Sequence, residues 1–417
     1  MTRIVIVNCG DECNRGVAAI HYGAIHLLRR IVPSAALVLR SIYSAEEAAW
    51  RDAFRFSAKR FSGVEFAPAP VRSPYCRGLG RRVWGPIETW SAGSKGRLHA
   101  WCDALSDADL VVTRSSPLLT SSSYAATAGV WCLGPLQAAR RIGVAYGFGP
   151  ESFHPLRGIV VRRTIRKIGD RLRFAFCRDR ASIRVLEGLG IRAEYALDLA
   201  FWIEPRGSRE VRELSDRLGL RAGRFFVAAP RVDMDKDAAT TMIEVSTLLV
   251  QRYGLQCVVV PHAVGGRRGE VWDVAQAERV ARTVPDAIVL REEFDPETLA
   301  GMYGQAALLV GARVHSLLLA LRAGTPVLGI PGDGRAEAIL GALGVGRVLR
   351  PSAVAGVGEE ARRDWLLREI EIALAVERST IHWRIQALRE ESQERLHKAI
   401  AGCLEESDCE VRLADKI

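Results

Sequence analysis

The chain has 417 residues and a mass of 45.7 kDa, with 48% hydrophobic and 25% charged residues. This composition is typical of a folded globular protein, and it excludes intrinsic disorder, a collagen-like repeat and a small disulfide scaffold. A chain of this length buries most of the surface that its unfolded state exposes, so we expect its cores to fold without a metal or cofactor.

The formal net charge is +10, and the basic residues are nearly all arginine. Six of the 58 basic residues are lysine, which leaves 52 arginines. Arginine binds phosphate and carboxylate through a planar fork that lysine lacks. Coding bias can produce the same excess of arginine over lysine. The excess also agrees with a partner that carries phosphate or a sugar acid. There is no basic stripe with interleaved aromatic residues, so nucleic acid is not expected as a partner.

The nine cysteines are scattered along the chain, odd in number, and none is paired at two-residue spacing. This usage is typical of a reduced, intracellular protein. The apolar run Ile4–Val7 is too short for a signal peptide, and no stretch approaches the ~18 apolar residues of a membrane span. We therefore expect a cytoplasmic protein, and peripheral contact with the inner face of a membrane stays open.

Short β-branched runs alternate with helical patterns in the first half of the chain, which predicts a parallel sheet covered by helices. The first strand, residues 3–7, leads through a polar turn into a helix over 17–31. Further strands are expected at 37–39, 64–67, 109–113 and 142–147.

Residues 68–95 are rich in Gly, Pro, Arg and Trp and show no clear period, so we interpret them as an irregular surface insertion. Its aromatic residues Tyr75, Trp84 and Trp90 could stack on a sugar ring or cover a core edge.

A second series of strands begins near residue 225, after Pro, Arg and Gly interrupt the pattern at 204–208. Its strands are expected at 225–229, 256–260, 287–290, 308–310 and 326–330. Residues 359–404 are predicted to form one continuous helix. The sequence therefore predicts an α/β fold with two Rossmann-like αβα domains, 1–204 and 205–350, and a helical tail, 351–417.

The segment from Arg157 to Arg173 holds seven basic residues and one acidic residue, interleaved with aliphatic ones. A basic amphipathic helix can lie on an anionic membrane, which would suit a lipid-linked acceptor. A helix face exposed only to solvent is the alternative.

Two strand ends carry groups suited to chemistry. The turn after the first strand places Asp11, Asn14 and Arg15 at a helix N-terminus, without the glycine spacing of a dinucleotide site. A polar capping turn is the structural alternative. After the strand at 308–310, Arg313 could clamp an anion, and His315 could donate or accept a proton close to a helix N-terminus.

The pattern of the chain resembles the polysaccharide pyruvyl transferases over about residues 4–350. The resemblance rests on three groups of residues, which are the turn Asn8-x-Gly10-Asp11-x-x-Asn14-Arg15-Gly16, the motif Arg178-Asp179-x-x-Ser182 with Leu189-Gly190 and Asp198-Leu199-Ala200-Phe201, and the segment from Leu308 through Arg313-x-His315 to Gly324-x-Pro326-Val327. It implies a GT-B-like arrangement of two Rossmann-like domains facing across a cleft. It also implies transfer of pyruvate from phosphoenolpyruvate onto a sugar as a ketal.

The resemblance assigns roles to particular residues. Arg313 and Arg178 would hold the donor, with Arg231 as a third cation, and His315 would be the acid or base. His262 could take the complementary proton, and Asp11 is a base candidate from the other domain; both have structural alternatives. Neither a metal nor a resident cofactor is required, and the acceptor would be a sugar or a lipid-linked glycan. The remaining substrate-binding candidates are Asn14, Arg15 and Arg114.

The chain departs from the family pattern after the strand at 109–113, where Arg114-Ser115-Ser116 stand in place of a Gly-Gly turn. This loss of glycine argues against a close backbone approach, but Arg114 and the two hydroxyls could line an anion site. Asp333-Gly334-Arg335 stands near the place where many members have a lysine.

Two other functions stay open. A nucleotide-sugar glycosyltransferase would share the architecture, although the chain has no distinctive motif that reads a ribose or a diphosphate. A non-catalytic binding homologue is suggested by Ser115-Ser116.

Overall fold

The computed structural model describes residues 1–72, 94–115, 117–119, 132–153, 156, 159–265, 273–332, 334–350 and 356–414. Its contacts divide the chain into two compact units. The first unit comprises 1–12, 20–199 and 390–417, and the second comprises 13–19 and 200–389. The sequence places the boundary at 204, and the contacts place it at 199–200. The first turn of helix α1 (Arg15–Ile31) belongs to the second unit and the rest of that helix to the first.

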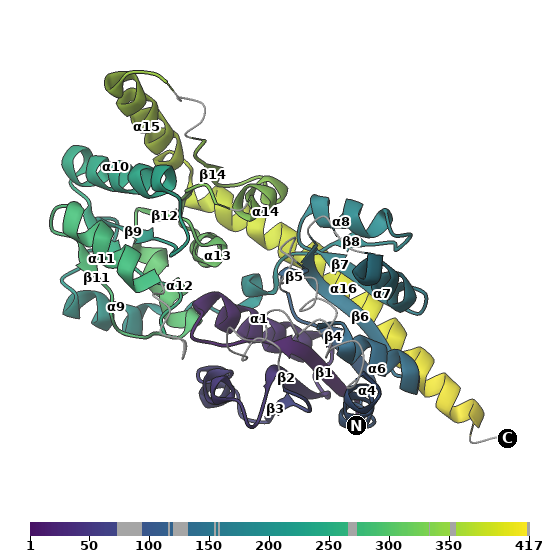
Figure 1. Ribbon diagram of the computed structural model, residues 1–417. Helices are drawn as coiled ribbons and strands as arrows, with labels where there is room; N and C mark the ends of the chain where they lie inside the picture. Colours follow the sequence, from purple (N-terminus) through teal and green to yellow (C-terminus); the bar gives the residue numbers. More distant parts are fainter. Residues whose placement is uncertain are drawn as a thin grey trace. The chain divides into compact units, whose positions relative to one another are not determined.

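The first unit is built on a parallel sheet with the strand order β3-β2-β1-β4-β6-β7-β8, and β5 pairs with β6 (Figure 1). Its strands in the described ranges are β1 (Arg3–Cys9), β2 (Ala36–Ser44), β3 (Val64–Ala69), β4 (Leu110–Thr113), β5 (Pro117–Leu119), β6 (Ala145–Phe153), β7 (Phe174–Cys177) and β8 (Glu194–Tyr195). Residues Ile4–Val7 of β1 are at most 2% exposed. Continuous aliphatic runs form such strands because helices cover both faces of a parallel sheet.

The second unit repeats the same design with the strand order β11-β10-β9-β12-β13-β14. Its strands in the described residues are β9 (Phe225–Ala229), β10 (Gln256–Val259), β11 (Ile288–Val289), β12 (Leu308–Gly311), β13 (Val327–Gly329) and β14 (Arg347–Val348), all paired in parallel. Both sheets therefore have the doubly wound order, in which the direction of winding reverses between the first and fourth strands of the unit.

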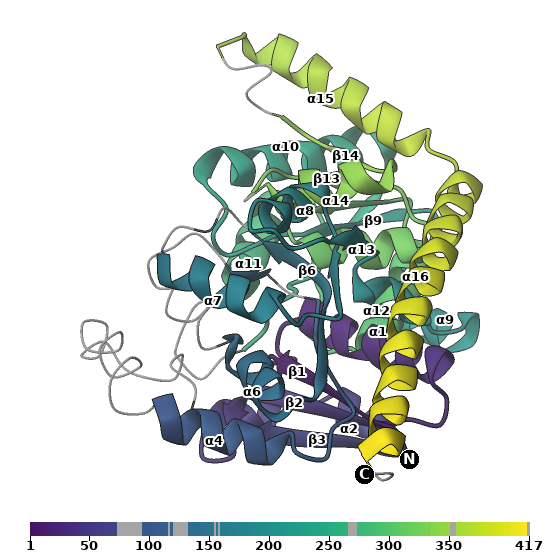
Figure 2. The ribbon, with the colours of Figure 1, turned by 90° about the vertical axis from the view of Figure 1, so that its right-hand side faces the viewer.

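Helices cover both sheets. In the first unit, α4 and α6 pack on each other (Figure 2). In the second, α15 packs on α10 and contributes Leu366, Ile370 and Ala373 to the core. The other helices and 3-10 turns are η1 (Ala48–Asp52), α2 (Ser57–Arg60), α4 (Ser94–Ala104), α6 (Gly134–Ile142), α7 (Ile159–Gly169), α8 (Arg180–Glu187), η4 (Leu199–Trp202), α9 (Ser208–Arg217), α10 (Lys236–Tyr253), α11 (Asp273–Thr283), α12 (Pro296–Gln305), α13 (Val314–Arg322), α14 (Arg335–Leu343), α15 (Glu359–Leu374) and α16 (Arg378–Ala414).

The predicted α/β fold with two Rossmann-like sheets is confirmed, while the bounds of several predicted elements differ; the strand expected at 37–39, for example, extends over Ala36–Ser44. The strand expected at 142–147 begins at Ala145, because Ile142 ends α6 and Gly143 terminates that helix with a φ of 81°. The helix expected over 359–404 is broken at 375–377. Its two parts bury different apolar faces, since α15 packs into the core of the second unit and the later residues Leu396 and Ile400 of α16 are buried in the first.

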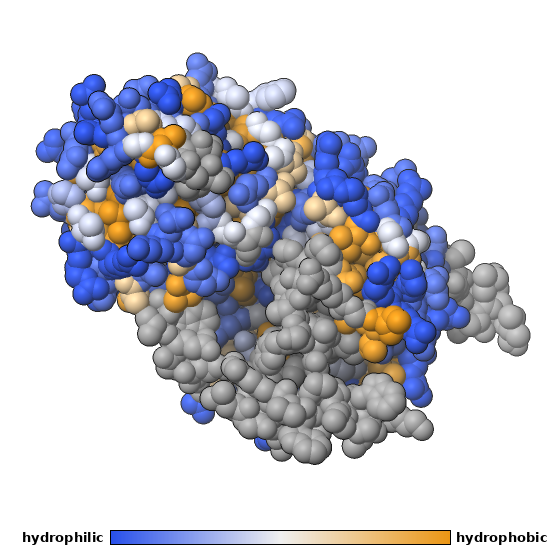
Figure 3. All heavy atoms as spheres, turned by 45° about the horizontal axis from the view of Figure 1, so that its top comes forward, coloured by the Kyte–Doolittle hydropathy of each residue, from blue (hydrophilic) through white to orange (hydrophobic). Residues whose placement is uncertain are grey.

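Polar residues cover most of the described surface on the face that Figure 3 draws, and apolar residues form small patches there. Among the described residues, no helix is both long and apolar enough to cross a bilayer.

Candidate functional site

The carboxyl edge of the second sheet brings together a guanidinium and a carboxylate at its switch point. β9 and β12 are neighbours there, and Arg313 follows β12 by two residues. The Arg313 Nε and Nη2 atoms donate to the two carboxylate oxygens of Asp273 at 2.9 and 2.6 Å. This bidentate pairing fixes the plane of the guanidinium.

Asp273 connects three loops at this edge. The backbone N–H groups of Val232, after β9, and Ala263, after β10, each donate to it at 2.9 Å, and Arg313 follows β12. Asp273 is fully buried, whereas the Arg313 side chain is 19% exposed. The aspartate therefore fixes the direction of the arginine, and part of the Arg313 side chain stays exposed.

His315 lies against the backbone of the glycine in the opening turn. A Cβ atom added at Gly16 would lie 2.4 Å from the His315 Nδ1, closer than real contacts allow. Asn14 caps the helix, since its Oδ1 accepts from the Gly16 N–H at 2.9 Å, and the Arg15 N–H donates to the His262 carbonyl at 2.9 Å. The Asn-Arg-Gly turn thus brings a helix N-terminus against the second unit's histidines.

The His262 imidazole is buried against a tyrosine hydroxyl. It is 1% exposed, and its Nε2 lies 2.7 Å from the Tyr303 hydroxyl. Burial lowers the pKa of His262 well below its ordinary value, and the charges of Arg15, Arg313 and His315 lower it further. Burial also raises the pKa of Tyr303. The imidazole is thus held by Tyr303, and the His262 backbone carbonyl separately accepts from the N–H at the start of α1.

Arg231 pairs with a nearby carboxylate rather than standing alone. Its Nη2 donates to the Asp233 Oδ2 at 2.6 Å, and its side chain is 15% exposed. Burial raises the pKa of Asp233, but Arg231 and the charge of Arg313 outweigh that effect, so the pKa is lowered. The second unit therefore brings together Arg231, Arg313 and His315, with Asp233 and Asp273 as the partners of the two arginines.

Arg178, assigned to substrate binding from the sequence, is a structural residue in the first unit. It is 1% exposed, it forms an ion pair with the buried Asp198, and its Nε donates to the Ser152 hydroxyl at 2.7 Å. Asp179 caps α8 by accepting from the Ser182 N–H at 2.7 Å. The Arg-Asp-x-x-Ser motif thus forms a buried polar network, and the Arg178 guanidinium is not exposed to a donor substrate.

The opening turn is also fixed in the first unit, through Glu12. This buried carboxylate lies 2.9 Å from the His21 Nδ1 and accepts from the Phe56 and Ser57 N–H groups at 2.6 and 3.0 Å. Asp11 precedes it and is partly exposed. Asp11 stays a predicted base, in the first unit, while Arg313 and His315 belong to the second.

Some predicted site residues lie outside the described part of the chain. These are the aromatic residues Tyr75, Trp84 and Trp90, and also Ser116, Arg157 and Asp333. Ser115 is described; it is buried and its hydroxyl donates to the Pro150 carbonyl. That hydroxyl is therefore engaged within the fold.

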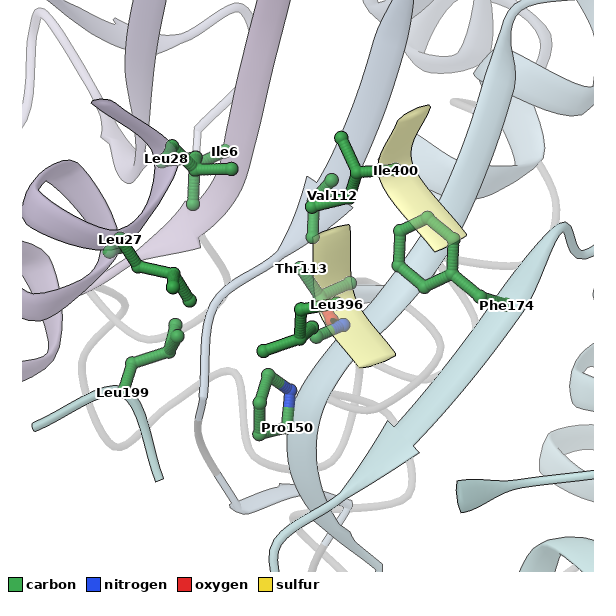
Figure 4. Close-up of a pocket in the computed structure, with 12 residues that line it drawn as sticks. Ile6, Leu27, Leu28, Val112, Thr113, Pro150, Phe174, Leu199, Leu396 and Ile400 are labelled. Atoms are coloured by element: carbon green, nitrogen blue, oxygen red, sulfur yellow. Dashed lines mark hydrogen bonds between the residues drawn. The ribbon is translucent and has the colours of Figure 1, made fainter. Parts of the chain in front are cut away.

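An apolar pocket of about 30 Å³ lies within the first unit (Figure 4). The side chains of Ile6, Leu27, Val112, Phe174 and Leu396 line it, and Figure 4 shows them converging from strands and helices. Such a lining offers a sugar or a phosphate few hydrogen-bond partners. The pocket is not a candidate for either substrate.

The sequence analysis missed Asp273 and Tyr303. Asp273 opens α11 and Tyr303 lies inside α12, and neither belongs to a recognisable motif. Only the folded chain brings them to Arg313 and His262. Within the described ranges, no group of three His, Cys, Asp or Glu residues is arranged to hold a metal.

A comparison with protein families matches residues 14–334 to the family described as polysaccharide pyruvyl transferase. No curated protein sequence matches the chain.

Solved structures of low sequence identity share the fold. A putative UDP-N-acetylglucosamine 2-epimerase from Listeria monocytogenes has a TM-score of 0.59 and 12% identity, over 97% of each chain. The UDP-GlcNAc 2-epimerase of Methanocaldococcus jannaschii has a TM-score of 0.56 and 10% identity, and the match covers 90% of this chain and 93% of that one. UGT2 of Phytolacca americana, complexed with UDP-2fluoro-glucose and pterostilbene, has a TM-score of 0.56 and 10% identity. That match covers 97% of this chain and 100% of the UGT2 chain. These similarities show a GT-B-like fold.

Proposed function

Because the chain belongs to the polysaccharide pyruvyl transferase family, we propose that it transfers pyruvate from phosphoenolpyruvate to two hydroxyls of a sugar in a polysaccharide or glycan precursor. The products are a cyclic pyruvyl ketal and phosphate. The observation that carries the proposal is the pairing of Arg313 with buried Asp273 at the switch point of the second sheet. His315 follows Arg313 by two residues.

In this proposal the donor binds to the second unit. Phosphoenolpyruvate carries a carboxylate and a phosphate, and the guanidinium groups of Arg313 and Arg231 supply charge for both. Each guanidinium is oriented by a carboxylate, Asp273 or Asp233. Preorganised cations of this kind stabilise charge in a transition state without reorganising during the reaction.

His315 is the proposed acid. It protonates the methylene carbon of the donor, which becomes the methyl group, and the central carbon becomes oxocarbenium-like. One sugar hydroxyl adds to that carbon and its proton returns to His315. The second hydroxyl displaces phosphate, which leaves with the second proton. Asp11 is the proposed base for the second hydroxyl, and it passes that proton to the departing phosphate.

We also propose that α7 contacts an anionic membrane surface. Its exposed side chains are Ile159, Val160, Arg162, Arg163, Arg166 and Lys167, so cations and aliphatic residues share the exposed face. Ile159 and Val160 are 67% and 52% exposed. Basic residues attract anionic lipids, and inserted aliphatic side chains add affinity. Cosedimentation with phosphatidylglycerol vesicles tests this; equal binding to phosphatidylcholine vesicles, or no loss in Arg162→Gln/Arg163→Gln, would refute it.

Thermal unfolding with phosphoenolpyruvate, UDP, GDP or phosphate at matched ionic strength tests the main proposal. A ligand that binds only the folded protein raises its stability. We expect a shift with phosphoenolpyruvate that is lost in Arg313→Gln, followed by phosphate release when sugar acceptors are added.

Two other outcomes would replace the proposal. A shift with UDP or GDP alone would indicate a nucleotide-sugar glycosyltransferase. Two solved structures of similar fold have a UDP-sugar bound. Binding of phosphoenolpyruvate without turnover on any sugar would indicate a non-catalytic homologue.

A further inference from the structure

We propose that Arg114, Asn8 and Gly10 form an anion site at the carboxyl edge of the first sheet, which binds a phosphate or carboxylate group of the sugar acceptor. The acceptor role rests on the proposed function. The anion site itself rests on the arrangement of these residues in the first unit.

The three residues lie at the switch point of the first sheet. β1 and β4 are neighbours there, and Val7 pairs with Thr113 in the register. The next residues along each strand are therefore Asn8 and Arg114, side by side, and the Arg114 N–H donates to the Val7 carbonyl at 3.3 Å. Ligands of doubly wound sheets bind outside the carboxyl ends of the strands at this point.

Arg114 forms no ion pair with the described residues. Its buried Nε and Nη1 atoms also have no hydrogen-bond partner among them. Glu12, the nearby buried carboxylate, is already engaged by His21, Ser57 and two backbone N–H groups. An unpaired guanidinium with buried donors is costly, and an anion removes that cost.

The backbone beside Arg114 is shaped for close approach. A Cβ atom at Gly10 would lie 3.0 Å from the Arg114 Nη2, so the glycine leaves room for the guanidinium. Asn8 has a φ of 65°, which side-chain-bearing residues rarely adopt. It is 3% exposed; its Nδ2 donates to the Cys132 carbonyl at 2.9 Å, and its Oδ1 is buried without a partner in the described ranges.

The unsatisfied groups define the chemistry of the ligand. The Arg114 donors require anionic oxygens, and the Asn8 Oδ1 requires a donor such as a hydroxyl. A sugar phosphate or a sugar acid supplies both groups in one molecule. A neutral sugar supplies only the hydroxyl and leaves the guanidinium unpaired.

Thermal unfolding of the full chain with glucose 1-phosphate, glucuronate, glucose or phosphoenolpyruvate tests this inference. We expect a shift with one of the two sugar anions and none with neutral glucose, and the anion that acts identifies phosphate or carboxylate as the group bound. In Arg114→Gln the affinity for that anion should fall roughly tenfold or more. Arg313→Gln should retain it, as should Arg192→Gln, which changes an exposed arginine of the same unit.

The outcomes separate this site from the proposed function. If phosphoenolpyruvate fails to bind but the sugar-anion shift is lost in Arg114→Gln alone, the donor assignment fails and the anion site stands. If neither sugar anion shifts the thermal unfolding, or if the shift is unchanged in Arg114→Gln, the anion site is refuted. If Arg114→Gln abolishes the phosphoenolpyruvate shift and Arg313→Gln does not, Arg114 binds the donor and the acceptor assignment is overturned.

Discussion

The two sheets have the same winding order, and each places an arginine at its switch point, but the two arginines have opposite surroundings. Arg313 in the second unit is clamped by the buried carboxylate of Asp273. Arg114 in the first unit forms no ion pair among the described residues. A clamped guanidinium has a fixed direction, which suits a reacting anion, whereas an unneutralised one gains most from binding a charged ligand.

Arg178 shows a third environment for arginine at a strand end. It follows β7, pairs with buried Asp198 and is 1% exposed. A guanidinium that is paired with a buried carboxylate and is not exposed to solvent is typical of a structural arginine. Exposure and partner therefore distinguish the three residues, although each follows a buried strand of similar composition.

The largest effect is expected when Asp273 is removed, because Arg313 then resembles Arg114. In Asp273→Ala the free energy of unfolding of the second unit should fall by about 3–5 kcal/mol, since one partner of a buried ion pair and the acceptor of two backbone N–H groups are lost. Urea denaturation measures this loss. Asp233→Ala is the control; its carboxylate is 57% exposed, so a loss of equal size would contradict the argument.

Removing the clamped cation should abolish most of the transfer. Arg313→Gln should lower kcat/KM for phosphoenolpyruvate by roughly 10²–10³-fold, the usual cost of one preorganised electrostatic contact. Initial rates of phosphate release measure it. The Arg192→Gln variant should keep the wild-type rate, and an unchanged rate in Arg313→Gln would remove this residue from the donor site.

The position of His315 should depend on the glycine of the opening turn. A Cβ at Gly16 would overlap the imidazole, so Gly16→Ala should displace the ring and lower kcat by about 10²-fold. Gly96→Ala, at a position with open space in α4, is the matched control. Equal kcat values in both variants would show that His315 is not held by this contact.

Each unit also has a buried histidine, and both should make stability depend on pH. Burial lowers the pKa of both His21 and His262. Glu12 opposes this effect at His21 without reversing it, and the charge of Arg15 adds to it at His262. Below the ordinary pKa of about 6.5 the unfolded chain binds protons that the folded chain does not.

The free energy of unfolding should therefore fall as the pH drops from about 6.5 to 5, by up to about 1.4 kcal/mol per pH unit for each histidine. Urea denaturation across this range should show a shallower slope in His262→Gln. His99→Gln, whose side chain is 79% exposed, should keep the wild-type slope. A slope unchanged in His262→Gln would mean that this imidazole is charged in the folded state.

The smallest effect on stability is expected at Arg114. Arg114→Gln removes an unneutralised charge, so the free energy of unfolding without ligand should stay within about 0.5 kcal/mol of wild type or rise. Thermal unfolding without added anions measures this. A clear loss of stability would mean that Arg114 is paired within the fold, as Arg178 is.

The sequence alone determined the fold class and the strands at the centre of each sheet. The aliphatic runs at 3–7 and 225–229 predict buried parallel strands, because only residues apolar on both faces suit such a position. The Arg-x-His segment and the Asn-Arg-Gly turn were also recognisable, since each follows a strand and opens a helix. Local patterns of this kind need no knowledge of distant contacts.

Only the tertiary structure decided which partner each charged residue has. Asp273 lies 40 residues from Arg313, and nothing in its neighbourhood in the sequence marks it as the partner. Arg178, Arg114 and Arg313 look alike in the sequence, and their roles follow from whether a buried carboxylate reaches them. Ion pairing depends on contacts between residues distant in the chain, and periodicity and propensity carry no information about those contacts.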